Sequence, residues 1–315
     1  MDAPPLNFVP SLWLGMIGLA IALAAPVEGA RPLLKMAGRG LCFGVGANVL
    51  IFSFVPAVIT RFTPLPWIAA LVALILLSAA QALRWIATGV FYKLLVERGA
   101  PRWVAFALGV YAGTFVPMVF PWNPAGGATP WPVMVQLADI VGERGVSALM
   151  ALTSALLAEA FLVRRDRKRA TKLAGGAVAV VVMTLVSGWI RIRQIDALRA
   201  ASPTARVALV QPSVGATLRW DPSAATRILD ELVTLTVAAE KDGAELVVWH
   251  EGAYPYVLPH SARHAPSGRG AIVGARVHGP VLAGIILNGA PHEETNSAIL
   301  VQPNDTFGEP YDKMH

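Results

Sequence analysis

Long apolar stretches separated by short polar segments fill the first 190 residues of the chain. A helix needs about 20 mostly apolar residues to cross the hydrocarbon core of a bilayer. Six stretches approach that length, near residues 6–25, 41–59, 65–86, 103–120, 145–163 and 173–190. The pattern therefore predicts a membrane domain over residues 1–190 with about six helical spans. The first stretch has no positive charge ahead of it, which favours a retained span over a cleaved signal peptide.

The pattern changes after residue 200, where short runs rich in β-branched residues replace the long apolar stretches. These runs predict strands at 205–211, 245–250, 271–277, 281–287 and 297–302. Between the first two, Asp221 is a good N-cap, Pro222 suits the first helical position, and Gly243 is a helix stop. A strand, a helix and then several strands indicate an α/β domain over residues 204–315. Residues 191–203 are expected to be a linker.

The basic residues are distributed unevenly, and their distribution predicts the orientation of the membrane domain. The chain is 55% hydrophobic, only 15% charged and has a net charge of +6. Thirteen basic residues fall in three loops, at 26–40, 84–102 and 164–172, whereas the intervening loops carry only Arg61 and Arg144. Because positively charged loops stay in the cytoplasm, the N-terminus and everything after residue 190 are expected outside it.

The charge of the second half also bears on the class of partner. Residues 1–190 carry a net charge of +8, whereas residues 191–315 carry −2. Nucleic-acid surfaces are strongly basic, so the charge of the second half disfavours nucleic acid as a partner. The basic excess of the whole chain is instead a signal of membrane topology.

Several features within the membrane half have a structural and a functional interpretation. Gly40, Gly44 and Gly46 predict a face for close helix packing. Gln81 with Arg84, and Glu159 with Arg164, are polar pairs near membrane depth, for which a structural role is favoured. The uncharged, proline-rich segment 117–132 predicts an irregular loop at the outer interface. Its tryptophans suit an aromatic belt, and a lipid-facing entrance is an equal alternative.

Glu251 is the first candidate for chemistry in the second half. It follows a predicted buried strand and precedes a loop with Gly and Pro, and strand ends of open α/β sheets are where ligands bind. Trp249, Tyr254 and Tyr256 flank it, so apolar surroundings are expected to raise its pKa and suit it to general-base catalysis. A solvated glutamate at a strand end is the alternative. Lys313, isolated from other basic residues, indicates little alone.

A metal site is disfavoured. His250, His260 and His264, together with Glu251, are potential ligands, but no predicted helix aligns them as it would in an HExxH motif. Cys42 is the single cysteine, so neither a disulfide framework nor a cysteine-based metal site can form within one chain.

Four segments taken in series resemble a known family. VALVQPSVGATLRWDP, ELVVWHEGAYP, NSAILVQP and YDKMH resemble the nitrilase-like (carbon–nitrogen hydrolase) domain of the apolipoprotein N-acyltransferases. FPWNPAGGATPWPVMVQLADIVGERGVSAL is similar to the segment after the fifth span of that family. The resemblance implies a multi-span α-helical membrane domain followed by an α/β nitrilase-like αββα sandwich, incomplete here, with residues 204–315 as its N-terminal part.

The resemblance also implies an activity and a location. The family transfers an acyl chain from a phospholipid to the N-terminal diacylglyceryl-cysteine of lipoproteins through a cysteine thioester, without a cofactor. The implied partners are a phospholipid donor, a lipoprotein acceptor and the membrane itself. The implied place is the bacterial inner membrane, with residues 191–315 on the periplasmic side.

Residue roles follow from the resemblance. Glu251 matches the general base and Lys313 the lysine that stabilises the oxyanion, whereas Trp220 and Tyr254 are implied to contact substrate. The nucleophilic cysteine of the family lies after the lysine, and Cys42 falls in a predicted span. The chain is therefore expected to be shorter than the family at both ends. A non-catalytic membrane protein that retains lipid or lipoprotein binding, and another membrane-anchored nitrilase-type amidase, are the alternatives.

Overall fold

A computed structural model of the chain describes residues 8–215, 218, 221–273, 276–289 and 293–314. Internal contacts divide the chain into two compact units, Met1–Ala201 and Ser202–His315, and each is described by itself. Trp220, which the resemblance implies as a substrate-contacting residue, lies outside the described residues.

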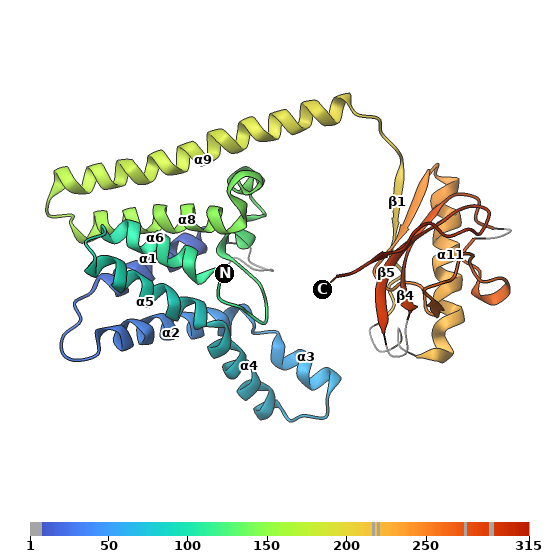
Figure 1. The fold of residues 1–315 in the computed structure, drawn as a ribbon, viewed down its shortest axis with the longest axis horizontal. Helices are drawn as coiled ribbons and strands as arrows, with labels where there is room; N and C mark the ends of the chain where they lie inside the picture. The colour runs from blue at the N-terminus through green and yellow to red at the C-terminus, as the bar shows by residue number, and fades with distance from the viewer. Residues whose placement is uncertain (1–7, 216–217, 219–220, 274–275, 290–292, 315) are drawn as a thin grey trace. The chain divides into compact units, whose positions relative to one another are not determined.

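The first unit is helical (Figure 1). Its elements are α1 (Ser11–Ala24), α2 (Pro32–Ile51), α3 (Val55–Phe62), α4 (Trp67–Gln81), α5 (Leu83–Glu97), α6 (Arg102–Gly113), the 3-10 turn η1 (Pro124–Ala128), α7 (Pro132–Val135), α8 (Ala138–Leu162) and α9 (Arg167–Ala201). Four helical segments among the described residues are long and apolar enough to cross a membrane: α2, the continuous α4–α5 segment, α8 and α9. The described residues thus contain a helical domain with several membrane-length segments, four where about six spans were expected.

The helix ends differ from the expected spans. Helix α2 ends at Ile51 and α3 begins at Val55, so no single helix covers 41–59. Helix α5 continues to Glu97, which places Arg84 inside a helix instead of in the expected loop at 84–102. Helix α9 continues to Ala201, so most of the expected linker is helical. Polar residues with good helix propensity extend a helix beyond its apolar stretch, and a search for apolar runs does not detect that extension.

Small residues allow α2 to pack closely on α5. A Cβ atom added at Gly40 would collide with the carbonyl oxygen of Trp85, and one added at Gly44 would lie 2.6 Å from the Cβ of Ala82. A Cβ added at Gly46 would meet nothing within 4 Å. The packing role expected for this glycine series is therefore confirmed for Gly40 and Gly44, whereas Gly46 lies off the contact face.

Buried polar side chains of α4 and α5 hold the segment 117–132. The Gln81 side chain donates to the carbonyl oxygen of Phe120 (3.0 Å) and accepts from its backbone N–H (3.3 Å). Arg84 donates to the carbonyl oxygen of Trp122. These bonds give Gln81 and Arg84 the structural role that the sequence favours.

The second polar pair has other partners than expected. Arg169 donates to the Glu159 carboxylate at 3.2 Å, and Arg102 lies 3.9 Å from it. Arg164 instead lies over the ring of Phe161. Glu159 therefore links α8 to the start of α9 and to α6.

The second unit is a mixed six-stranded sheet. Its strands are β1 (Val207–Val210), β2 (Leu246–Trp249), β3 (Val257–Pro259), β4 (Val281–Asn288), β5 (Glu294–Val301) and β6 (Tyr311–Asp312). The order is β1-β2-β4-β5-β6, with β3 paired to β4. Strands β1, β2, β3 and β4 pair in parallel, whereas β5 is antiparallel to both β4 and β6. The expected α/β architecture is confirmed at this level.

One expected strand is absent. The described residues of 271–277 form no strand and lie in a loop after the 3-10 turn η3 (Gly268–Gly270). Ile272, Val273 and Val277 of this loop are nevertheless buried in the core. An apolar run can satisfy burial without joining a sheet. Strands β3 and β6, of three and two residues, fall outside the predicted set.

Helix α11 (Ala225–Lys241) packs on one face of the sheet through a buried stripe that includes Ile228, Leu229 and Leu232 (Figure 1). The 3-10 turn η2 (Pro222–Ala224) leads into it, and the Asp221 carboxylate accepts the Ser223 N–H there, as expected of an N-cap. Gly243 follows the helix with φ of +85°, a left-handed conformation that glycine adopts without strain.

Candidate active site

The sheet topology brings the segments that carry Glu251 and Lys313 to the same edge. Strand β6 is antiparallel to β5, which is antiparallel to β4, so β6 runs in the direction of β4 and β2. Glu251 follows the end of β2 and Lys313 follows the end of β6. Both side chains therefore start from carboxyl ends of parallel strands, the edge at which open α/β sheets bind ligands.

Two strands separate β2 from β6, and the turn after β2 narrows this distance by passing over the face of β4, before the chain returns as β3 to the edge of β4 that β2 occupies. The crossing occurs at Gly284, where an added Cβ would collide with the carbonyl oxygen of His250 and lie 2.9 Å from the Cα of Glu251. The backbone N–H of Tyr254 donates to the Gly284 carbonyl (3.0 Å) and fixes the crossing. Glycine at this position therefore lets the backbone carry Glu251 toward β5 and β6.

Glu251 lies within hydrogen-bond distance of two donors. Lys313 Nζ lies 2.9 Å from its Oε1 atom, and the Asn296 side-chain amide of β5 donates to the same oxygen. The Lys313 backbone N–H donates to the Asn296 carbonyl at 2.8 Å, which continues the β5–β6 pairing. The Glu251 and Lys313 side chains are 63% and 54% exposed, so the pair is open to solvent.

The described residues do not provide the apolar enclosure expected around Glu251. The Trp249 indole is buried on the α11 side and donates to Thr236 at 2.9 Å. Tyr254 is also buried, and its hydroxyl donates to the carbonyl of Gly270 (2.7 Å). Burial, followed by the nearby Tyr256, raises the Tyr254 pKa, so this phenol stays neutral. Glu251 lies in the turn after β2 and Tyr254 in the loop before β3, so residues that are close in sequence are not held around the carboxylate by a regular strand.

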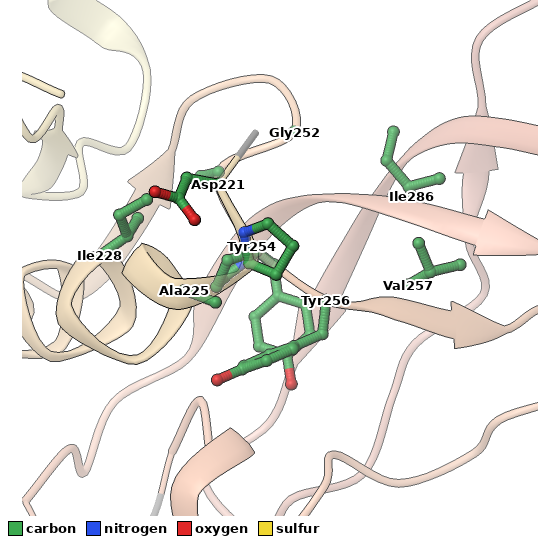
Figure 2. A pocket seen from close by; sticks show the side chains of 11 residues that line it. Asp221, Ala225, Ile228, Gly252, Tyr254, Tyr256, Val257 and Ile286 are labelled. Carbon is green, nitrogen blue, oxygen red and sulfur yellow. The ribbon is translucent and has the colours of Figure 1, made fainter. Parts of the chain in front are cut away.

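Two cavities lie beside the turn that carries Glu251. One, of about 230 Å³, is lined by Asp221, Tyr254, Tyr256 and Ile286 among others, and Figure 2 shows the two tyrosine rings close to each other among these side chains. The other, of about 320 Å³, is lined by Gln211, Pro212, Val214, Ile228, His250, Glu251 and Ala253. Ile228 and Ala253 line both cavities. The site thus offers one space at the carboxylate and a second, more apolar one at the tyrosines.

Two of the candidate histidines contact other groups of the described residues. His250 Nδ1 lies 2.9 Å from the Glu251 carbonyl oxygen, and His260 Nε2 lies 2.9 Å from the Asp312 carboxylate. Within the described ranges no three His, Cys, Asp or Glu side chains gather as metal ligands would. Cys42 has an exposed side chain in α2 of the helical unit.

Asn296 and Gly284 are the site residues that sequence reasoning missed. An isolated glycine within the run VLAGIILN is a recognised signal of close backbone approach, so Gly284 could have been found. Asn296 gave no such signal, because its contact with Glu251 depends on the β4–β5 pairing and on the crossing at Gly284.

Comparison with known proteins agrees with the resemblance of the sequence segments. Residues 1–156 match the model of the apolipoprotein N-acyltransferase N-terminal domain. An apolipoprotein N-acyltransferase of Geobacter metallireducens is 27% identical over 95% of this chain and 62% of its own length. That of Brucella suis biovar 1 is 32% identical over 49% of this chain and 29% of its own. That of Shewanella oneidensis is 27% identical over 79% of this chain and 48% of its own length. The chain is therefore a homologue of the apolipoprotein N-acyltransferases and spans about three-fifths of the Geobacter relative.

Proposed function

We propose that this chain carries part of the catalytic machinery of an apolipoprotein N-acyltransferase, with Glu251 as general base and Lys313 as the group that stabilises an oxyanion. The observation that carries the proposal is the 2.9 Å contact between the Glu251 carboxylate and the Lys313 ammonium. Such a pair supplies a proton acceptor and a fixed positive charge within one site. The names of the homologues supply the reaction class.

In the proposed reaction, a cysteine thiol attacks the ester carbonyl of a phospholipid. Glu251 takes the thiol proton, and Lys313 meets the negative charge that develops on the carbonyl oxygen. The lysophospholipid leaves with that proton, and a thioester remains. The α-amino group of a lipoprotein's diacylglyceryl-cysteine then attacks the thioester, Glu251 accepts the amine proton, and the thiol is regenerated.

The nucleophile of this reaction is proposed to lie in the part of the family that these residues do not match. The chain spans 62% of the Geobacter relative, and Cys42 lies in helix α2. The second unit is proposed to be the N-terminal part of a nitrilase-like sandwich, on the periplasmic side of the inner membrane. Trp220 and Tyr254 are proposed to contact substrate, and the apolar cavity that Tyr254 lines supports this for Tyr254. No cofactor takes part.

The test completes residues 1–315 with the C-terminal part of the Geobacter relative and expresses the product in a strain depleted of its own acyltransferase. The completed chain should restore growth, whereas Glu251→Gln and Lys313→Met should not. Lys241→Met, at the end of α11, removes the same charge elsewhere in the unit and should leave growth unaffected. Growth with Glu251→Gln would contradict the proposed role of the carboxylate.

The alternative functions give other outcomes in the same strain. Lipoprotein binding by the completed chain, without growth or acylation, would indicate a non-catalytic membrane protein. Hydrolysis of small amides without lipoprotein acylation would indicate a nitrilase-type amidase.

A further inference from the structure

Three polar side chains beside the Glu251–Lys313 pair form a separate hydrogen-bonded chain. Ser297 donates to Asp312 Oδ1 at 2.6 Å, and His260 Nε2 lies 2.9 Å from Asp312 Oδ2. The Asp312 carboxylate thus uses one oxygen for each of these two residues, and Thr295 is a further hydrogen-bond partner. Nothing in the proposed reaction assigns a role to this His260–Asp312–Ser297 chain.

These three hydrogen-bonded side chains do not form a nucleophilic triad. A serine nucleophile needs an imidazole to take its proton, with the carboxylate on the far side of the imidazole. Here Ser297 donates its single hydroxyl proton to Asp312, and His260 contacts the same carboxylate. The arrangement therefore places the carboxylate between the serine and the imidazole, so the imidazole is not in position to take the serine proton.

The three side chains come from three different segments of the sheet. Ser297 lies in β5, Asp312 lies in β6, and His260 directly follows β3. The backbone N–H of His260 donates to the Asn288 carbonyl (2.8 Å) at the end of β4, so the imidazole starts from a fixed position. Asp312 is consequently tied to both β5 and the end of the β3–β4 pair.

Strand β6 needs this support because it is only two residues long. Its ladder pairs Ser297 with Asp312 and Ala298 with Tyr311. Side chains alternate between the two faces of a strand, so Asp312 points to one face and Lys313 to the other. A slip of one residue would exchange the two faces and take the lysine away from Glu251.

We propose that Asp312 is a positioning residue that, through His260 and Ser297, fixes the register of β6 and so presents Lys313 to Glu251. This inference rests on the proposed function for its significance, but its geometry can be tested without acyl transfer. The hydrogen bonds from Ser297 and then His260 hold the pKa of Asp312 below its usual range, which keeps the carboxylate ionised at neutral pH.

The test measures how fast Lys313 of the full chain, purified in detergent, reacts with an amine-acylating reagent, with each lysine read out by mass spectrometry. A lysine nitrogen held in contact with a carboxylate reacts slowly, because it must leave that contact before it can attack the reagent. Asp312→Asn and His260→Leu should each raise the rate at Lys313 by roughly two- to five-fold, the range expected for loss of an exposed ion pair. Ser297→Ala, which removes only a hydroxyl, should raise it in the same direction.

Matched controls separate positioning from general loss of structure. Lys241 lies in the same unit and should react at an unchanged rate in every variant. Glu309→Gln removes one negative charge three residues before Asp312, at an exposed position, and should leave Lys313 unaffected. His260→Gln keeps a donor for Asp312 and should restore slow labelling. Unchanged labelling of Lys313 in Asp312→Asn and Ser297→Ala, or an equal rise at Lys241, would overturn the proposal.

A failure of the proposed function would leave this experiment unaffected. A completed chain without acyltransferase activity would still show slow labelling of Lys313. Conversely, if the completed enzyme is active but Lys313 labelling is the same in the wild-type chain and in the Asp312 and Ser297 variants, only the positioning role is excluded.

Discussion

Glu251 Oε1 accepts from Lys313 and Asn296, whose positions lie 62 and 45 residues further along the chain. Contacts of this kind cannot be deduced from spacing, because they depend on strand order and register. Glu251 was a candidate from its place after a predicted strand, Lys313 was inferred only through the resemblance to a family, and Asn296 was not inferred at all. The arrangement of Glu251 with these two donors therefore depends on the order and register of the strands, and no local sequence motif specifies it.

Asp221 is the residue for which the structure predicts a dependence on pH. Ser223 donates to its carboxylate through its hydroxyl (2.7 Å) and its backbone N–H (2.9 Å), and these bonds lower the Asp221 pKa. A folded-state pKa below the unfolded one stabilises the fold at neutral pH, and this contribution is lost as the pH falls through the lowered value.

Hydrogen exchange of residues 222–230 in the full chain measures this effect. Protection at the start of α11, corrected for intrinsic rates, should fall in the wild-type chain as the pH drops below about 4. Asp221→Asn keeps an acceptor that does not titrate, so its protection should change less over that range. An equal fall in both chains would rule out Asp221 as the titrating group.

The sequence predicted those helices and strands whose formation depends on residues that are close together in the sequence. The α11 helix was predicted from Asp221, which caps the turn η2 leading into it, and from its stop at Gly243. Strand β6 was not, because a two-residue strand exists only through its pairing with β5. The apolar run 271–277 was interpreted as a strand because burial in a core loop and burial in a sheet select the same residues.

Gly284 of β4 allows the turn that carries Glu251 to lie against this strand. Gly284→Ala would place a Cβ against backbone atoms of His250, Glu251 and Gly252, which no rotamer change can relieve. We expect a loss of roughly 1–3 kcal/mol in stability, as for other overpacked positions, and faster acylation of Lys313 as Glu251 is displaced. Gly289→Ala is the control, since its Cβ would lie 3.7 Å from His260 in ordinary contact. Thermal unfolding that is equal for both variants would contradict the crossing as described.

Packing of α2 on α5 predicts opposite effects for two nearby glycines. Gly44→Ala would place its Cβ 2.6 Å from the Cβ of Ala82 and should destabilise the helical unit. Gly46→Ala would meet nothing within 4 Å and should be neutral or stabilise by up to about 1 kcal/mol through helix propensity. Thermal unfolding in detergent decides this, and a larger loss for Gly46→Ala than for Gly44→Ala would refute the packing.

At the scale of the whole molecule, a helical unit with four membrane-length segments precedes an α/β unit. The segments and the basic loops were visible in the sequence because bilayer thickness and charge asymmetry act on long stretches. Arg84 and Lys93 were assigned to a loop and lie in α5, yet the other basic residues of the three segments still far outnumber Arg61 and Arg144. We therefore keep the proposed orientation, with the α/β unit outside the cytoplasm.

Thiol labelling of spheroplasts tests this orientation. In a Cys42→Ser background, an impermeant maleimide should label Ser267→Cys, an exposed position of the α/β unit, before lysis. Arg165→Cys, exposed between α8 and α9, should react only after lysis. The reverse pattern would invert the proposed topology.

The most direct test of the central claim is the mass of a lipoprotein N-terminal peptide produced by purified enzyme. The chain completed with the C-terminal part of the Geobacter relative is incubated with phospholipid and a diacylated lipoprotein. The account predicts that the peptide gains one acyl chain, and that Glu251→Gln slows this by roughly 100-fold or more, as loss of a general base does. An unchanged rate with Glu251→Gln, or no mass gain from a folded completed chain, would contradict it.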